Sequence, residues 1–334
     1  MENKITLDTG SGGRKMQKLI RETILKYVSF NHGPLEDSAV LNKLNNDIAF
    51  TTDSFVVDPI FFPGGDIGKL SVYGTVNDLS VSGAEPLYLS LSFIIEEGFE
   101  LINFEKIIES INDACIKANV KIVTGDTKVV PKGKCDKIFI NTSGIGNIIT
   151  KSRISEVNLK KGDRIIVSGN VGEHGASIIA ARGEFHLETE LCSDLYPLNL
   201  YTVPLFKKDY QISAMRDITR GGLATVLNEF AIASNCMLEI NEKDIPFSNA
   251  TKGIADILGL DPLYFACEGA FIAAVDSKDY KVMLEFMHDE LKLKDSRVIG
   301  EVIDTGISEV NLKTEIGGVR ILSMLEGEQY PRIC

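Results

Sequence analysis

The sequence lacks several features that would each point to a particular class of function. It has no block rich in lysine and arginine, and 47 acidic side chains against 35 basic ones give a net charge of −12. Such a chain suits neither nucleic acid nor an anionic membrane surface. No uninterrupted apolar run approaches the ~20 residues of a membrane span, and the first residues, MENKITLDTGSGG, lack an apolar signal core. We therefore expect a cytoplasmic protein, which can still bind a phosphorylated ligand if its site supplies metal ions and a few lysines.

Cysteine and histidine are few and scattered. The six cysteines, at positions 115, 135, 192, 236, 267 and 334, include no CxxC pair, and the four histidines are equally dispersed. In a reducing compartment this pattern argues against a disulfide framework and against a structural zinc site. Most of the cysteines are expected to be small core residues. Cys334 differs, because a last residue has nothing after it to bury, and taken alone it reads as an incidental thiol on a frayed end.

Helical and extended patterns alternate along the chain, which predicts a mixed α/β protein of the α+β type. Its 334 residues favour two domains. Apolar residues recur at helical spacing in 14–28, 103–118 and 221–234. The segments expected to form strands are 47–55, 87–95, 120–126, 137–146, 165–169 and 269–275. The polar stretch 150–164 breaks the pattern, so we expect domains at 1–150 and 151–320, followed by a flexible tail at 321–334, without internal repeats.

Two glycine-rich stretches tempt a nucleotide-loop interpretation, and both fail on spacing. In PGGDIGKL (63–70), Pro63 occupies the position of the first Walker glycine, and Leu70 replaces the Ser or Thr that would contact Mg²⁺. GNVGEHG (169–175) follows a predicted strand but does not match GxGxxG. We expect a turn there and no dinucleotide site.

Acidic residues provide a stronger signal. Four aspartates each lie at or near the end of a strand-like segment, namely Asp37, Asp53, Asp78 and Asp126. Together they could converge on Mg²⁺, which proteins usually share with substrate phosphates. Each one alone is better explained as the cap of a turn or helix. The whole set, with Asn77 beside one member and Lys128 near another, favours a metal–phosphate site.

Long and specific strings run through the chain in a fixed order: GSGGRKMQKLI, TDSFVVDPIFFPGGDIGKL, GTVNDLSVSGAEPLYLS, IVTGDTKVV, MRDITRGGLA, FACEG and, at the end, PRIC. In this order they resemble the HypE family of hydrogenase maturation proteins from about residue 5 to residue 334. That family is similar to aminoimidazole ribonucleotide synthetase, selenophosphate synthetase and thiamine monophosphate kinase. Those relatives bind ATP through aspartate-held Mg²⁺ without a Walker loop, and they do not share the cysteine tail.

The chain departs from the family pattern at two positions. Thr9 stands where the family usually has His before the first glycine pair, and a threonine can hydrogen-bond a phosphate but cannot carry a positive charge. Cys267 replaces the Asn of the usual ANEG string, which removes an amide next to Glu268 and could alter substrate positioning.

The resemblance implies a two-domain fold whose first half presents a β-sheet to a second copy, giving a homodimer. It implies ATP-dependent dehydration of a carbamoyl group on Cys334 to a thiocyanate, which supplies the cyanide ligand of [NiFe]-hydrogenase iron. HypF would donate the carbamoyl group, and the HypC–HypD complex would accept the cyanide. ATP and Mg²⁺ are the implied cofactors.

Roles for individual residues follow from what this reaction needs. Mg²⁺ would lie on Asp37, Asp53, Asp78 and Asp126, and ATP would contact these residues together with Lys69, Asn77, Asp217 and Arg220. Lys128 would stabilise negative charge on the carbamoyl oxygen or the transferring phosphoryl group. Glu268 is the candidate base for protons on nitrogen, although it could also cap a helix or turn. The segment 321–334 reaches roughly 45 Å when extended, enough to bring Cys334 to a nucleotide.

Two other functions remain open from the sequence. A small-molecule kinase or ligase of the same superfamily would not need Cys334. A non-catalytic carrier would present the thiol to partners, but it would need neither the aspartates nor Glu268.

Overall fold

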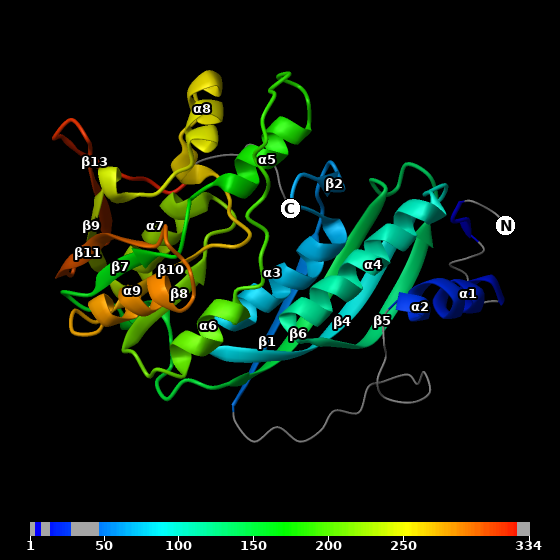
Figure 1. Ribbon diagram of the computed structural model, residues 1–334, viewed down its shortest axis with the longest axis horizontal. Coiled ribbons are helices and arrows are strands. Elements are labelled where there is room, and N and C mark those ends of the chain that lie inside the picture. Colours follow the sequence, from blue (N-terminus) through cyan, green and yellow to red (C-terminus); the bar gives the residue numbers. More distant parts are fainter. Residues whose placement is uncertain (1–3, 8–13, 28–46, 326–334) are drawn as a thin grey trace.

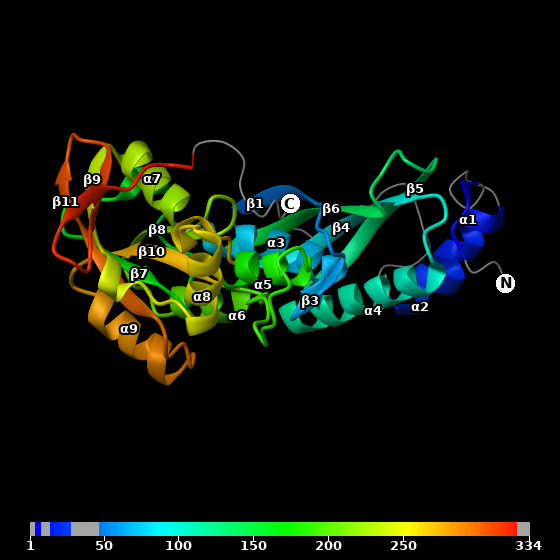
Figure 2. The ribbon, with the colours of Figure 1, turned by 90° about the horizontal axis from the view of Figure 1, so that it is seen from above.

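The computed structural model describes residues 4–7, 14–27 and 47–325, and the structural statements below concern these residues. They form two large sheets that lie at opposite ends of an elongated molecule, with α3 between them, and a separate two-stranded hairpin (Figures 1 and 2). Both sheets carry helices, which confirms the predicted mixed α/β class.

The first sheet has four strands in the order β1-β6-β4-β5. The strands are β1 (Ile48–Phe55), β4 (Ala84–Glu96), β5 (Lys121–Val130) and β6 (Ile138–Ile148). β4 and β5 run parallel, whereas the other neighbours are antiparallel. Helices α3 (Ile67–Val81) and α4 (Leu101–Ala118) cover one face of this sheet (Figure 1).

Burial alternates along these strands, as expected for a sheet with one covered face. On the side away from α3 and α4, large apolar side chains remain exposed, among them Ile48, Phe50 and Ile94. This open face of the four-stranded sheet therefore exposes large apolar side chains that a surface in contact with water alone does not need.

Short elements surround this half. The hairpin of β2 (Phe61–Phe62) and β3 (Gly65–Asp66) leads directly into α3. The Asp66 carboxylate caps α3 by accepting hydrogen bonds from the backbone N–H groups of Gly68 and Lys69. An aspartate thus occupies the helix start where a Walker loop would hold phosphate, in agreement with the rejection of that motif. The N-terminal helical segment consists of α1 (Arg14–Leu19), η2 (Ile20–Ile24) and α2 (Leu25–Tyr27).

The second sheet has seven strands in the order β13-β12-β9-β11-β7-β10-β8, in which only β12 and β9 pair in parallel. Its strands are β7 (Arg164–Val167), β8 (Ile212–Asp217), β9 (Cys236–Asn241), β10 (Phe271–Val275), β11 (Arg297–Thr305), β12 (Glu309–Lys313) and β13 (Val319–Ile321). The helices of this half are α5 (Glu173–Ala181), α6 (Asn199–Phe206), α7 (Gly222–Ser234), α8 (Asn249–Leu258) and α9 (Tyr280–Asp289), with short turns η3 (Glu156–Asn158), η4 (Glu242–Asp244) and η5 (Pro262–Tyr264).

Each face of the seven-stranded sheet has its own apolar core. Ile165 of β7 packs in the core that contains Phe230 of α7, while the next residue, Ile166, packs with Met283 of α9 and Leu205 of α6. This alternation follows from the two-residue period of a strand. Both faces of the seven-stranded sheet are therefore covered, whereas the four-stranded sheet has one covered face and one open face.

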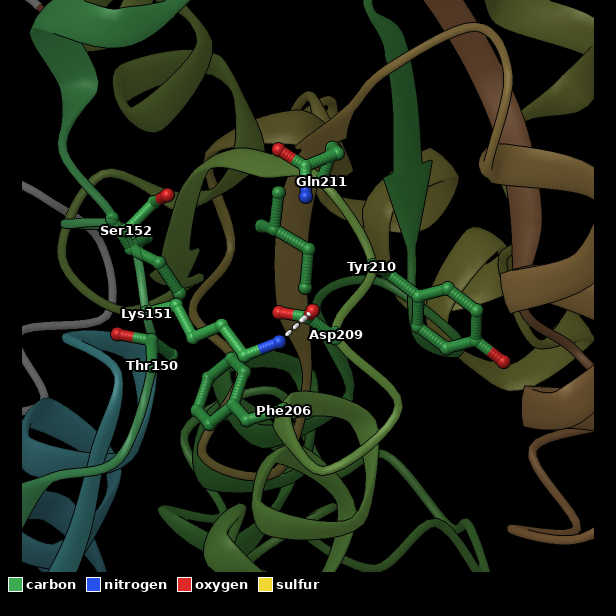
Figure 3. A pocket seen from close by; sticks show the side chains of 9 residues that line it. Thr150, Lys151, Ser152, Phe206, Asp209, Tyr210 and Gln211 are labelled. Carbon is green, nitrogen blue, oxygen red and sulfur yellow. Dashed lines mark hydrogen bonds and ion pairs between the residues drawn. The ribbon is translucent and has the colours of Figure 1, made fainter.

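The connection between the halves packs closely against the second one. Thr150, Lys151 and Ser152 lie beside the chain that joins α6 to β8, around a cavity of about 30 Å³ (Figure 3). The Lys151 ammonium forms an ion pair with the Asp209 carboxylate at the edge of this cavity. This ion pair ties the connection to the second half, whereas the Thr150 hydroxyl, which also lines the cavity, has no hydrogen-bond partner among the described residues.

Three smaller predictions can be checked here. The turn expected at 169–175 is confined to 169–172, with Gly172 at a φ of 81°, because α5 already begins at Glu173. The five cysteines in the described part of the chain are free thiols, and three of them are buried. The tail begins later than residue 321, because Leu322 is fully buried and its N–H donates to the Val310 carbonyl oxygen. Within the described residues, no helix is both long and apolar enough to cross a membrane.

Candidate functional site

A small buried pocket of about 30 Å³ lies where α3 and β1 of the first half meet the end of β8 in the second. Four carboxylates and one guanidinium contribute to its lining. The lining residues are Asp53, Phe55, Leu70, Gly74, Asp78, Asp217, Thr219, Arg220 and Glu268.

The first half supplies two of the carboxylates from different elements. Asp53 lies on β1, on the face covered by helices, and Asp78 lies on α3. Gly74, one turn before Asp78, has no side chain because a Cβ there would lie 2.6 Å from the Phe55 ring. The Thr51 hydroxyl donates to the Asp78 carboxylate at 2.9 Å and fixes its orientation.

The second half supplies its groups from a tight strand-to-helix turn. Asp217 is the last residue of β8, and Arg220 follows just before α7. Gly222 has a φ of 63°, and a Cβ there would lie 2.5 Å from the Leu263 carbonyl oxygen, so only glycine fits. The two glycines of RGG therefore allow the turn that brings Asp217 and Arg220 to the pocket.

The carboxylates of the pocket repel one another in a poorly hydrated site. Burial, and then the charge of Asp78, raises the pKa of Asp217 to about 7. Burial also raises the pKa values of Asp53 and Asp78, although Arg220 opposes both shifts. The pKa of Glu268 is well above its usual value, first because of burial and then because of the nearby Asp194. The pocket is therefore short of positive charge.

This donor set fits a magnesium ion. Mg²⁺ prefers oxygen ligands and usually takes one or two carboxylates together with waters and substrate phosphates. Among the described residues, no group of three or more acidic, histidine or cysteine side chains is arranged to hold a metal ion on its own. An ion at Asp53, Asp78 and Asp217 would therefore need phosphate oxygens or waters to complete its ligands.

Replacing Asp217 with asparagine is expected to stabilise the metal-free protein increasingly as pH rises from about 4 to about 7. Its folded pKa lies above the unfolded value of 3.8, so the folded state holds the proton across this window and stability falls as pH rises. Each pKa unit corresponds to about 1.4 kcal/mol, so the gain is on the order of a few kcal/mol. Urea unfolding in the presence of a chelator measures it.

The informative quantity is the difference in the free energy of unfolding between Asp217→Asn and the wild-type protein. His174, whose pKa burial lowers to about 3, contributes a pH slope of the opposite sign in both proteins. A difference that stays constant from pH 4 to pH 8 would contradict the repulsion described for Asp217.

A larger cleft of about 470 Å³ adjoins the pocket, and Asp78 and Asp217 belong to both linings. Its other walls are mostly apolar and come from β1, the end of α3, η3 and β8. Arg216 forms ion pairs with Glu156 and, at 3.3 Å, with Glu229, which fixes one wall. The cleft has room for a ligand much larger than an ion, next to the carboxylates.

The structure thus brings together five of the residues singled out in the sequence: Asp53, Asp78, Asp217, Arg220 and Glu268. The expectation that Asp78 lies at a strand end is wrong, because it lies within α3. Asp126 lies inside β5 and not at its end.

Asp126 and Lys128 are not part of this pocket within one chain. They form an exposed ion pair at 3.5 Å on β5, the opposite edge strand from β1, roughly 14 Å away at ~4.8 Å per strand. Their parallel partners in β4 are Ser92 and Ile94, so they lie on the open face, whereas Asp53 lies on the covered face.

Asn77 and Lys69 also lie outside the pocket. The Asn77 amide donates to the carbonyl oxygens of Tyr196 and Glu268 and accepts from the Leu198 N–H. Both donors of the Asn77 amide are thus engaged with the second half of the molecule, and its contact with a nucleotide stays a prediction. Lys69 lies nine positions before Asp78, half a turn away around α3, on the side of Lys117.

Three positions of interest, Thr9, Asp37 and Cys334, lie outside the described residues. Cys267, by contrast, is fully buried, and its sulfur accepts a hydrogen bond from the Gly172 N–H at 3.0 Å. Its replacement of the family's asparagine therefore places a thiol inside the core, one residue before Glu268.

Asp194 was missed in the sequence. Its carboxylate accepts hydrogen bonds from the backbone N–H groups of Glu268 at 2.9 Å and Gly269 at 3.0 Å. Burial raises its pKa to about 7. The signal that could have found it is the long irregular segment 182–198 between two helices, since such loops in compact domains are usually functional.

Two protein-family models match separate parts of the chain. The model of the AIR synthase related protein N-terminal domain matches residues 35–148, and that of the corresponding C-terminal domain matches residues 160–313. Together they cover most of the chain.

Individual relatives match over nearly their full length. Carbamoyl dehydratase HypE of Rhodobacter capsulatus is 42% identical over 338 residues, covering 100% of this chain and 99% of the relative. The crystal structure of hydrogenase maturation protein HypE in complex with ATP has a TM-score of 0.93 at 43% identity, covering 98% of this chain and 99% of that chain. A chain in the crystal structure of a HypE–HypF complex has a TM-score of 0.80 at 44% identity, with 83% and 90% covered.

Proposed function

Because this chain belongs to the HypE family of AIR synthase-related proteins, we propose that it dehydrates a carbamoyl group carried on Cys334. The product is a thiocyanate, and ATP is converted to ADP and phosphate. The observation that carries this proposal is the buried Glu268 beside Asp53, Asp78 and Asp217, in a pocket that opens onto a cleft of ligand size.

The reaction needs an activated oxygen and the loss of two protons from nitrogen. The carbamoyl oxygen of S–C(=O)–NH₂ attacks the γ-phosphorus of ATP, the bond to ADP breaks, and one N–H proton leaves. Loss of the second N–H proton then expels phosphate and leaves S–C≡N. The net change is ATP plus thiocarbamate to ADP, phosphate, thiocyanate and one proton.

Glu268 is the residue placed to take protons from nitrogen. Its burial excludes water, which would otherwise return the activated group to the carbamoyl form. Its raised pKa makes it a strong base once ionised. Asp53, Asp78 and Asp217 would hold Mg²⁺ together with Asp37, and the bound ion would neutralise charge on the phosphates. Arg220, the cation of this pocket, would orient a phosphate or a carboxylate beside it.

A direct assay of the reaction distinguishes the dehydratase from a small-molecule kinase and from a non-catalytic carrier. The carbamoylated protein is incubated with Mg–ATP, and its intact mass is measured beside the ADP formed. We expect the chain to become lighter by one water per ADP, whereas Cys334→Ala carries no carbamoyl group. A small-molecule kinase would leave the carbamoylated chain unchanged, and a carrier would not consume ATP. Either outcome would overturn the dehydratase proposal.

Partner proteins follow from the same proposal. The similarity to a chain of the HypE–HypF complex supports HypF as the carbamoyl donor. The HypC–HypD complex, as acceptor of the cyanide, is an inference from the family resemblance and from the need to deliver the product to iron. Both roles suit a cytoplasmic location.

We also propose a homodimer formed through the open face of the four-stranded sheet. Phe50 and Ile94 are 68% and 44% exposed on that face, and a second copy would cover them. The same contact would place Asp126 and Lys128, which lie on this face, in the interface between the two copies.

Ile94→Glu is expected to convert the dimer into a monomer, because it places a charge in a surface that would become dry. Light scattering should then give about half the mass of the wild type. Ile116→Glu is the matched control, since Ile116 is 70% exposed on α4, away from the open face. An unchanged dimer in Ile94→Glu would rule out this face as the interface.

A further inference from the structure

The peptide groups around Glu268 are held from both sides. The Glu268 N–H donates to one oxygen of the Asp194 carboxylate at 2.9 Å, and the Gly269 N–H donates to the other at 3.0 Å. The Glu268 carbonyl oxygen accepts from the Asn77 amide at 3.1 Å and from the Tyr196 N–H at 3.3 Å. Four hydrogen bonds therefore hold the backbone around Glu268, and its side chain lines the carboxylate pocket.

The segment around Asp194 contacts this peptide directly. A Cβ at Gly269 would lie 1.8 Å from the Asp194 carbonyl oxygen and 3.0 Å from the Tyr196 Cβ. Any side chain at 269 would push the two segments apart. The close approach keeps Asp194 in hydrogen-bonding range of both N–H groups.

Asn77 connects this arrangement to the first half of the molecule. Its amide uses both donors and its acceptor on backbone groups of Glu268, Tyr196 and Leu198. Its neighbour on α3 is Asp78, which lines the pocket. One turn of α3 thus carries a pocket carboxylate and a side chain that holds the Glu268 peptide.

We propose that Asp194 and Asn77 are positioning residues that together aim Glu268 at the reacting nitrogen, with α3 setting its distance from Asp78. This rests on the dehydratase function proposed above. The roles are complementary, because Asp194 fixes the N–H side of the peptide and Asn77 fixes the carbonyl side. Neither side chain contacts the substrate.

The chemistry of the two side chains suits positioning. A carboxylate can accept two parallel N–H groups, one on each oxygen, and hydrogen bonds to a charged acceptor are stronger than neutral ones. An asparagine at 194 would turn its own NH₂ group toward one of those donors and lose that bond. Misplacing a reacting group by ~1 Å costs about 10²-fold in rate.

Asp194→Asn is therefore expected to slow thiocyanate formation about 10²-fold in single-turnover mass measurements at saturating ATP. The affinity for Mg–ATP should stay within a factor of ~3, because Asp194 does not line the pocket. In native-state hydrogen exchange, the amide of Glu268 should exchange at least ~10-fold faster. Combining Asp194→Asn with Glu268→Gln should give a rate no lower than Glu268→Gln alone, since Asp194 acts only through Glu268.

Asp66→Asn is the matched control. The Asp66 carboxylate also accepts two backbone N–H groups, but at the start of α3 and away from Glu268. It should lower the melting temperature while leaving the rate within a factor of ~3 and the exchange of the Glu268 amide unchanged. Asn77→Ala is a second variant in case Asp194→Asn does not fold, and it should slow the reaction in the same way.

The outcomes are separable. A wild-type rate in Asp194→Asn and Asn77→Ala would overturn the positioning role, and so would an equal loss of rate in Asp66→Asn. If the wild-type protein forms no thiocyanate, the proposed function fails. The exchange of the Glu268 amide then still decides whether Asp194 holds that peptide.

Discussion

Replacing Glu268 with glutamine is expected to slow dehydration by about 10³-fold, the range for loss of a general base. Glutamine keeps the size of the side chain and leaves the backbone bonds to Asp194 and Asn77 in place. It cannot accept a proton from nitrogen. The carbamoylated chain should accumulate with ATP still bound, which intact-mass measurement and calorimetry detect.

Glu173→Gln is the control for this result. Glu173 is a partly buried glutamate of the second half, and burial raises its pKa too, but it lies at the start of α5, outside the pocket. Its variant should dehydrate at a rate close to that of wild type. Normal turnover in Glu268→Gln would show that another group takes the proton, and the positioning proposal would lose its target.

The amphipathic elements were predictable from the sequence. The helical pattern at 103–118 corresponds to α4, which buries one face and exposes the other. The alternating pattern at 47–55 corresponds to β1. In both, one side faces the core and the other faces water, so periodicity is visible in the residues themselves.

α3 could not be found in this way. It is buried on almost every side, between the sheet, α4 and the second half, so its residues show no polar stripe. Its Thr and Val residues made the segment around Asp78 look extended. The error in placing Asp78 follows directly from that burial.

The candidate site was predictable in part. The sequence identified Asp53, Asp217 and Glu268 by residue type and resemblance, yet it could not show that they meet beside α3. The long loop between α5 and α6 could have drawn attention to this region, but it could not single out Asp194, whose role depends on a backbone contact with Glu268 that only folding creates. Asp126 shows another limit, since a predicted place near the end of a strand does not fix the face of the sheet on which the residue lies.

Asp78→Asn is expected to weaken Mg–ATP binding by about 10²-fold, equivalent to ~2.7 kcal/mol. Asparagine keeps the hydrogen bond from Thr51 and the packing of α3, but it removes one of the negative charges that repel each other in the metal-free pocket. The metal-free variant should therefore be at least as stable as wild type. Isothermal titration with Mg–ATP and urea unfolding in the presence of a chelator measure the two effects.

The opposite signs of these effects make the test specific. A general folding defect would lower both the affinity for Mg–ATP and the stability of the protein. Loss of a carboxylate that serves to bind a cation would lower the affinity alone. Asp136→Asn is the matched control, because it removes one exposed carboxylate of the same half outside the pocket and should change neither quantity. Unchanged affinity in Asp78→Asn would mean that Mg–ATP binds elsewhere. Another cation would then have to offset the repulsion between Asp78 and the neighbouring carboxylates.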